Sequence, residues 1–174
     1  MKPQIILELE KELNCTFKSV QLNNIDWWES DKTFEYSVDV TGNITGFAIR
    51  NIGLVKIPRT ISESTAHLNY LTSLNLSDNK ISDITPLSGL RTLKILNLIG
   101  NNISDISSLK ELNNIQDLNL NHNQIIDISP LRNLTNIVSL SLADNQISDI
   151  SPLRDLQTFV VLVYVLFKLR ILFL

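Results

Sequence analysis

Apolar and polar residues alternate in a pattern that returns every 22 residues from Leu71 onward. Leu74 and Leu76 alternate with polar residues, which predicts a strand with one buried face. A repeat of this length is typical of a solenoid, in which equivalent strands of successive coils stack into a parallel sheet. Four consecutive units read LTSLNLSDNKISDITPLSGLRT, LKILNLIGNNISDISSLKELNN, IQDLNLNHNQIIDISPLRNLTN and IVSLSLADNQISDISPLRDLQT.

An asparagine follows each predicted strand at the point where the chain has to turn away from the sheet. A buried side-chain amide can satisfy unpaired backbone groups of the turn and of the next coil. We therefore interpret this column as a structural asparagine ladder rather than as a row that binds a ligand. Its members are Asn79, Asn101, Asn123 and Asn145.

A column of aspartates comes next, followed by serine or threonine and, in three of the units, proline. Carboxylates in a row could bind calcium, but the glycine-rich nonapeptide of calcium-binding solenoids is absent, and aspartate is a good acceptor for nearby backbone amides. Turn or cap chemistry is the favoured interpretation. Thr85 followed by Pro86 predicts an N-cap and a first helical residue, opening short 3-10 turns. The aspartates are Asp83, Asp105, Asp127 and Asp149.

Residues 1–43 differ from the repeats and are predicted to form an N-terminal cap. Residues 4–13 have helical spacing, and Tyr36, Val38 and Val40 alternate before a turn at residues 41–43, which predicts a hairpin. A solenoid needs its terminal core covered. Trp27 and Trp28 could contribute to that cover or form a recognition surface, and both interpretations remain open.

Residues 44–70 fit the repeat frame imperfectly and are interpreted as a degenerate first repeat. Ile44, Phe47 and Ile49 take the strand positions, and Ile52 stands where the asparagine is expected. This segment is longer than one unit, so TISESTAHLNY is expected to hold an excursion. Residues 71–158 are the four regular units.

The frame, with its S-D-I-S-P-L segment, resembles bacterial leucine-rich repeats of the internalin type from Leu68 to Phe159. It also resembles intracellular 22-residue repeats of the phosphatase-regulator type. The resemblance implies an α/β leucine-rich repeat solenoid, with a parallel sheet on the concave face and short 3-10 or helical turns on the convex face. It also implies that the concave sheet binds another protein.

The outward-facing strand positions are the candidate partner-binding residues. Ile95 and Ile99 form an apolar spot among small polar side chains, with Asp117 as the nearby charge. The full set is Ser73, Asn75, Ser77, Ile95, Asn97, Ile99, Asp117, Asn119, Asn121, Ser139, Ser141 and Ala143.

Composition argues against other function classes. The net charge of −3 and the scattered basic residues give no nucleic-acid footprint. The one cysteine, Cys15, lies far along the chain from His67 and His122, and no glycine-rich phosphate loop is present. We therefore expect a non-enzymatic protein-interaction scaffold without metal or cofactor.

The N-terminus lacks a secretory signal, so a cytoplasmic protein is expected. Residues 159–174, FVVLVYVLFKLRILFL after Thr158, break the pattern. Their apolar run could tether the chain to a membrane, although a membrane span needs about 20 residues. Alternatively they are a frameshifted fifth repeat, which would make the chain a truncated fragment. Codon junctions from Val160 onward permit S-L-S-L and then Q-I-x-D-I, matching SLSLADNQISDI at residues 139–150.

Overall fold

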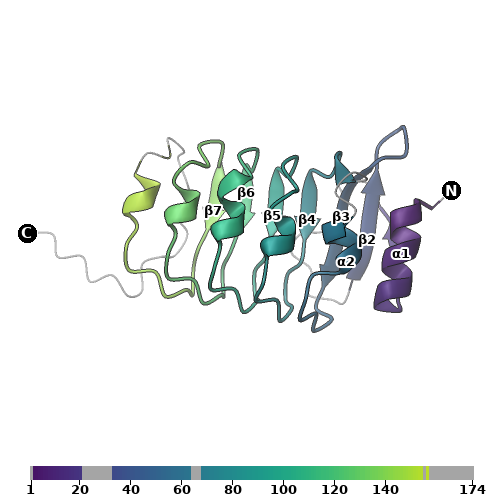
Figure 1. Cartoon of the computed structure of the whole chain (residues 1–174), viewed down its shortest axis with the longest axis horizontal. Helices are drawn as coiled ribbons and strands as arrows, with labels where there is room; N and C mark the ends of the chain where they lie inside the picture. The colour runs from purple at the N-terminus through teal and green to yellow at the C-terminus, as the bar shows by residue number, and fades with distance from the viewer. Residues whose placement is uncertain (1, 21–32, 64–67, 155, 157–174) are drawn as a thin grey trace, which may run out of the picture.

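The computed structural model describes residues 2–20, 33–63, 68–154 and 156. A seven-stranded sheet forms one side of the solenoid, and short 3-10 helices form the other side (Figure 1). In chain order the elements are α1 (Gln4–Leu13), β1 (Lys18–Ser19), β2 (Thr33–Val38), β3 (Ile44–Arg50), α2 (Arg59–Glu63), β4 (Ser73–Asn75), η3 (Thr85–Leu87), β5 (Ile95–Asn97), η4 (Ser107–Glu111), β6 (Asp117–Asn119), η5 (Ser129–Leu131), β7 (Ser139–Ser141) and η6 (Ser151–Leu153).

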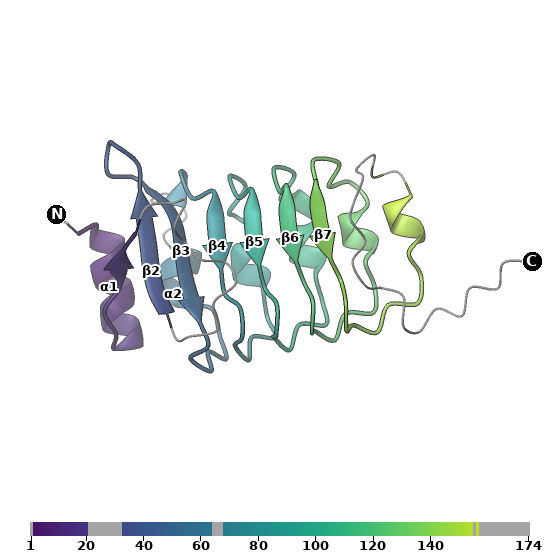
Figure 2. The ribbon, with the colours of Figure 1, turned by 180° about the vertical axis from the view of Figure 1, so that it is seen from behind.

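The strands lie in the sheet in the order in which they occur along the chain (Figure 2). The β2–β3 pair is antiparallel, and β3 to β7 are parallel, as the repeat pattern predicts. Each repeat adds one strand in strict register, so Leu96 pairs with Leu74 on one side and with Leu118 on the other. These leucines are at most 2% exposed, and together they form one continuous core between the sheet and the 3-10 helices.

The segment before the regular repeats pairs with them as a coil of the same solenoid. Phe47 of β3 lies opposite Leu74, and Ile44 and Ile49 are buried. The amide of Lys80 donates to Leu54, as the amide of Asn102 donates to Ile81 one coil later. The additional residues of this segment include α2, whose first amides, at Arg59 and Thr60, donate to the Glu12 carboxylate.

A helix and a hairpin cover the N-terminal end of the core. Helix α1 buries Ile5, Ile6 and Leu9, and it lies at the end of the solenoid beside β2 (Figure 2). The predicted hairpin is confirmed, but its first strand ends at Val38 and Val40 is fully exposed in the turn. Trp27, Trp28 and His67 lie outside the described residues.

The aspartates accept hydrogen bonds from the turn that follows them, as predicted, but the predicted N-cap is not observed. Asp83 accepts hydrogen bonds from the amide of Thr85, at 2.9 Å, and from the Thr85 hydroxyl, at 2.7 Å. The prediction that Thr85 is the N-cap is therefore wrong, because its hydroxyl is a donor to Asp83 and Thr85 is the first residue of η3. The same amide bond recurs at Ser107, Ser129 and Ser151.

These hydrogen bonds favour the charged form of the carboxylates. The side-chain and backbone bonds from Thr85 hold the pKa of Asp83 below its usual value. Bonds from the backbone and side chain of Ser107 lower the pKa of Asp105, and those of Ser151 lower the pKa of Asp149.

The hydrophobic segment 159–174 lies outside the described residues, so the structure tests neither the membrane-tether nor the frameshift interpretation. Within the part of the chain that the structure describes, no helix has the length and apolar character needed to cross a membrane.

Candidate partner-binding face

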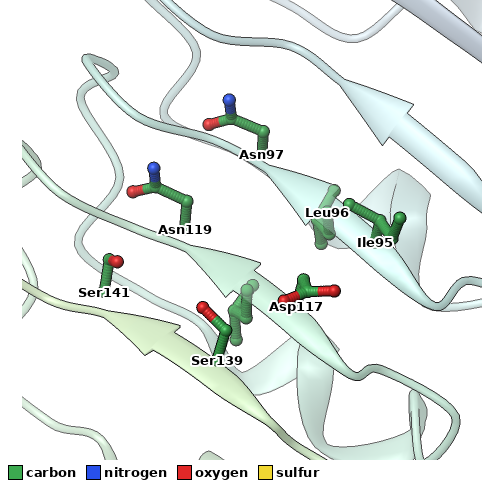
Figure 3. A pocket seen from close by; sticks show the side chains of 8 residues that line it. Ile95, Leu96, Asn97, Asp117, Asn119, Ser139 and Ser141 are labelled. Carbon is green, nitrogen blue, oxygen red and sulfur yellow. The ribbon is translucent and has the colours of Figure 1, made fainter. Parts of the chain in front are cut away.

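The outward-facing residues of β5, β6 and β7 stand in two parallel rows on the side of the sheet opposite the 3-10 helices. We call this side of the sheet, opposite the 3-10 helices, the sheet face. Ile95, Asp117 and Ser139 pair in register and form the first row. Asn97, Asn119 and Ser141 form the second row, two residues further along each strand (Figure 3).

The rows line a shallow hollow with a volume of about 160 Å³. Leu96 and Leu118, which lie between the two rows along their strands and are buried, also line it. Asp117 and Ser139 are exposed, whereas Ile95, Asn119 and Ser141 are half-buried. The hollow therefore combines an apolar wall, one carboxylate, amides and hydroxyl groups across three adjacent strands.

Exposure along the sheet face rises steeply from β4 to β7. Ser73 is 1% exposed, Asn75 0% and Ser77 3%, so their predicted exposure is wrong. Asn97, at 4%, is also buried. Alternation along a strand identifies which residues point away from the core, but it does not report whether another part of the chain covers them.

The closed part of the sheet face extends to β2 and β3 and contains charged groups. Arg50 is 1% exposed, and its guanidinium lies 3.9 Å from the Glu35 carboxylate. A buried charge is costly unless it is paired. This end of the face is therefore internal to the fold, and the accessible surface begins at β5.

Asparagines on the sheet face bind their own strands. The Oδ1 atoms of Asn75, Asn97 and Asn119 each accept the backbone amide two residues later, at 2.9 to 3.1 Å. These bonds fix the orientation of the amides. The Nδ2 atom of Asn119 is buried and finds no acceptor among the described residues.

The third row, Ile99, Asn121 and Ala143, is half-buried and lies at the rim of the hollow. Asn121 is engaged, because its Oδ1 accepts the amide of Ala143 at 2.6 Å. Beyond this row, His122 Nδ1 lies 3.0 Å from Asp144 Oδ2, with both side chains exposed.

The predicted asparagine ladder is confirmed as the device that fixes the strands behind this face. Asn101 Nδ2 donates to Leu98 and Ile99 of its own coil and to Leu76 of the preceding coil. Its Oδ1 accepts the amide of Ile81, also in the preceding coil. The sequence-based expectation placed the contacts on the next coil, and the structure reverses that direction. Asn79, Asn123 and Asn145 repeat the arrangement.

A second column, one residue before the ladder, was missed by the sequence reasoning. Asp78, Gly100, His122 and Asp144 all have φ between 53° and 67°, in the left-handed region. Glycine, aspartate, asparagine and histidine are enriched in that region, so the residue types carried a usable signal. The tight turn that follows each strand depends on this conformation.

The described residues form no group of three His, Cys, Asp or Glu side chains that could hold a metal ion. Burial, with a smaller contribution from Glu10, raises the pKa of the Cys15 thiol to about 11. A thiol of that pKa is almost entirely protonated at neutral pH and is a poor nucleophile.

The repeats are similar to those of known proteins. Residues 71–111 and 113–155 match the family model for leucine-rich repeats in two copies. An internalin of Listeria monocytogenes, InlF, is 32% identical with a TM-score of 0.55, over 64% of this chain and 38% of the internalin. The chain thus spans less than half of that internalin.

Two plant receptor structures share the fold. The leucine-rich repeat ectodomain of SOBIR1 from Arabidopsis thaliana is 23% identical, with a TM-score of 0.55 over 84% of this chain and 80% of the ectodomain. The plant peptide hormone receptor RGFR1, solved in complex with RGF2, is 25% identical, with a TM-score of 0.57 over 75% of this chain and 20% of the receptor. A search of curated protein sequences gives no match. Residues 71–155 thus resemble leucine-rich repeats, and the chain is similar to a bacterial internalin.

Proposed function

We propose that the protein is a non-enzymatic interaction scaffold that binds a protein partner through the open part of its sheet face, from β5 to β7. The single observation that carries this proposal is the hollow between Ile95, Asp117, Asn119 and Ser139. It lies where the sheet face is accessible, whereas the equivalent positions on β4 are closed.

The make-up of the face suits a partner that supplies the larger side chains. Binding energy in protein interfaces concentrates in a few residues, most often Trp, Tyr and Arg. The accessible rows on β5 to β7 hold none of these types, and Ile95 is their one large apolar residue. The hollow therefore has the character of a receptor for an inserted side chain.

A similar use of the fold supports the proposal. The plant receptor RGFR1 was solved with RGF2 bound. An extended ligand laid across parallel strands would meet identical backbone spacing at each step, with a new pair of outward side chains roughly every 4.8 Å.

The test is to block the hollow without altering the core. Wild-type protein is used to select binders from a phage-displayed library of random peptides, and the selected peptides are synthesised. Ser139 is exposed in the first row, so Ser139→Trp fills the hollow with a bulky ring. The matched control is Ser104→Trp, the same change at an exposed loop position away from the sheet face.

We expect Ser139→Trp to weaken binding of the selected peptides by about tenfold or more, and Ser104→Trp to leave binding unchanged. Far-ultraviolet circular dichroism verifies that both variants are folded. Equal binding by the two variants, or a failure of wild-type protein to enrich any peptide, would overturn the proposal.

A further inference from the structure

We infer that the partner inserts an arginine side chain into the hollow, with its guanidinium on Asp117 and its stem against Ile95. This inference rests on the proposed function and specifies the chemistry of the ligand. It follows from the size of the hollow, the charge in it and the position of its apolar wall.

The size of the hollow fits a side chain rather than a small molecule. Pockets for drug-sized ligands and cofactors have volumes of roughly 300–1,000 Å³. At about 160 Å³, the hollow is well below that range. One long side chain, presented by a backbone that runs over the strands, matches this volume.

The charge in the hollow favours a cation. Asp117 is exposed at the centre of the first row and makes no ion pair with any described residue. Ser139 stands opposite it on the next strand, a spacing of about 4.8 Å, and adds a hydroxyl acceptor. A guanidinium presents several donors in a planar fork and can bridge a carboxylate and a neighbouring acceptor, whereas an ammonium is a point charge.

The apolar wall lies on the opposite side of Asp117 from Ser139. Ile95 pairs with Asp117 in register and is half-buried (Figure 3). Arginine packs its three-carbon stem on apolar surface while its charged head remains at a polar group. Ile95 and Asp117 on adjacent strands supply these two surfaces in the required order.

The experiment uses the peptides selected on wild-type protein, with each arginine replaced in turn by citrulline, a neutral side chain of nearly the same shape, or by lysine. Binding is measured to wild-type protein, to Asp117→Asn and to Asp144→Asn. Asp144 is exposed beyond the third row and does not line the hollow, so Asp144→Asn removes an equal charge outside the hollow and serves as the matched control.

For one arginine of each peptide, we expect citrulline to weaken binding to wild-type protein by about five- to tenfold, and lysine to weaken it less. Asp117→Asn should abolish this preference for arginine, and Asp144→Asn should preserve it. If Ser139→Trp blocks the peptides but citrulline and Asp117→Asn have no effect, the arginine inference is overturned and the proposed function stands. If Ser139→Trp has no effect, both are overturned.

Discussion

The side-chain amide of Asn101 lies 3.0 Å from the main-chain oxygen of Leu76, which is 25 residues earlier in the chain. Its Oδ1 accepts the amide of Ile81 from the same earlier coil, also at 3.0 Å. One side chain therefore bonds backbone groups of two coils, and the Leu76 oxygen also accepts a hydrogen bond from Asn79 Nδ2. The hydrogen bonds of one coil are completed by a residue of the next coil.

Asn101→Ala should lower the free energy of unfolding by about 2–4 kcal/mol, because the buried amide of Ile81 loses its acceptor and three carbonyls each lose one hydrogen bond. Asn145→Ala should cost less, since Asn145 is only half-buried and water can replace part of its bonding. Urea denaturation measures both, with Asn102→Ala at an exposed position as the control. Equal losses for Asn101→Ala and Asn102→Ala would contradict the structural role of the ladder.

Asp83→Ala should lower the midpoint of urea denaturation more than Thr85→Ala does. Asp83 is the acceptor for both the amide and the hydroxyl of Thr85, so Asp83→Ala removes both hydrogen bonds. Thr85→Ala removes only the bond from the hydroxyl, and the backbone amide still donates to Asp83. The ranking distinguishes the observed cap from the N-cap that the Ser/Thr-Pro pattern predicts. A larger effect from Thr85→Ala would restore the sequence-based interpretation.

Stability in acid should depend on Asp39 in the hairpin turn. Hydrogen bonds from the side chains of Thr41 and Asn43 lower the pKa of Asp39 to about 2. In the unfolded chain the pKa is about 3.9, so the folded state favours the charged carboxylate. The resulting stabilisation is complete above the unfolded pKa and is lost as the pH falls through 2.

The matching experiment compares wild-type protein with Asp39→Asn between pH 5 and pH 2. The difference in their free energies of unfolding should shrink as the pH falls. Protonation of Asp39 removes the stabilisation by its charged carboxylate in wild-type protein, and Asp39→Asn lacks that stabilisation at every pH. Carboxyl titration by NMR, with Thr41→Val as a second variant, should show the Asp39 pKa rising when one donor is removed. A pH-independent difference would refute this assignment.

Gly100→Ala should destabilise the protein by about 1 kcal/mol, because residue 100 has φ of +67° and a side chain is strained there. A Cβ atom at this position would also lie 2.7 Å from Asp78 Oδ1. Gly100→Asn should cost less than Gly100→Ala, since asparagine tolerates left-handed backbone better. Thermal unfolding of both variants measures the two losses of stability. If Gly100→Ala is as stable as wild-type protein, the strain is absent.

Repetition made the strands, the ladder and the aspartate turns predictable. A single Asn101 would be ambiguous, but four asparagines at one position of a 22-residue frame indicate a shared backbone role. The sequence could not give the direction of the contact. An amide after a strand can reach either neighbouring coil, and the residue pattern is the same for both.

Accessibility along the sheet face could not be predicted. Ser73 and Ser139 occupy equivalent positions, have the same side chain and point away from the core, yet Ser73 is 1% exposed and Ser139 is open to solvent. Burial of an outward-facing position leaves no mark on the alternation of a single strand. Of the predicted binding residues, Ser73, Asn75, Ser77 and Asn97 are buried, contrary to the prediction.

The ladder also implies an order in which the coils become stable during synthesis. The amide of Ile81 finds its partner in residue 101, and that of Ile103 in residue 123. On the ribosome, each newly emerged coil would therefore lack these hydrogen bonds until about 20 more residues had been translated. Every added coil would then complete the hydrogen bonds of the coil before it, so that folding of the nascent chain would follow its synthesis with a delay of about one repeat.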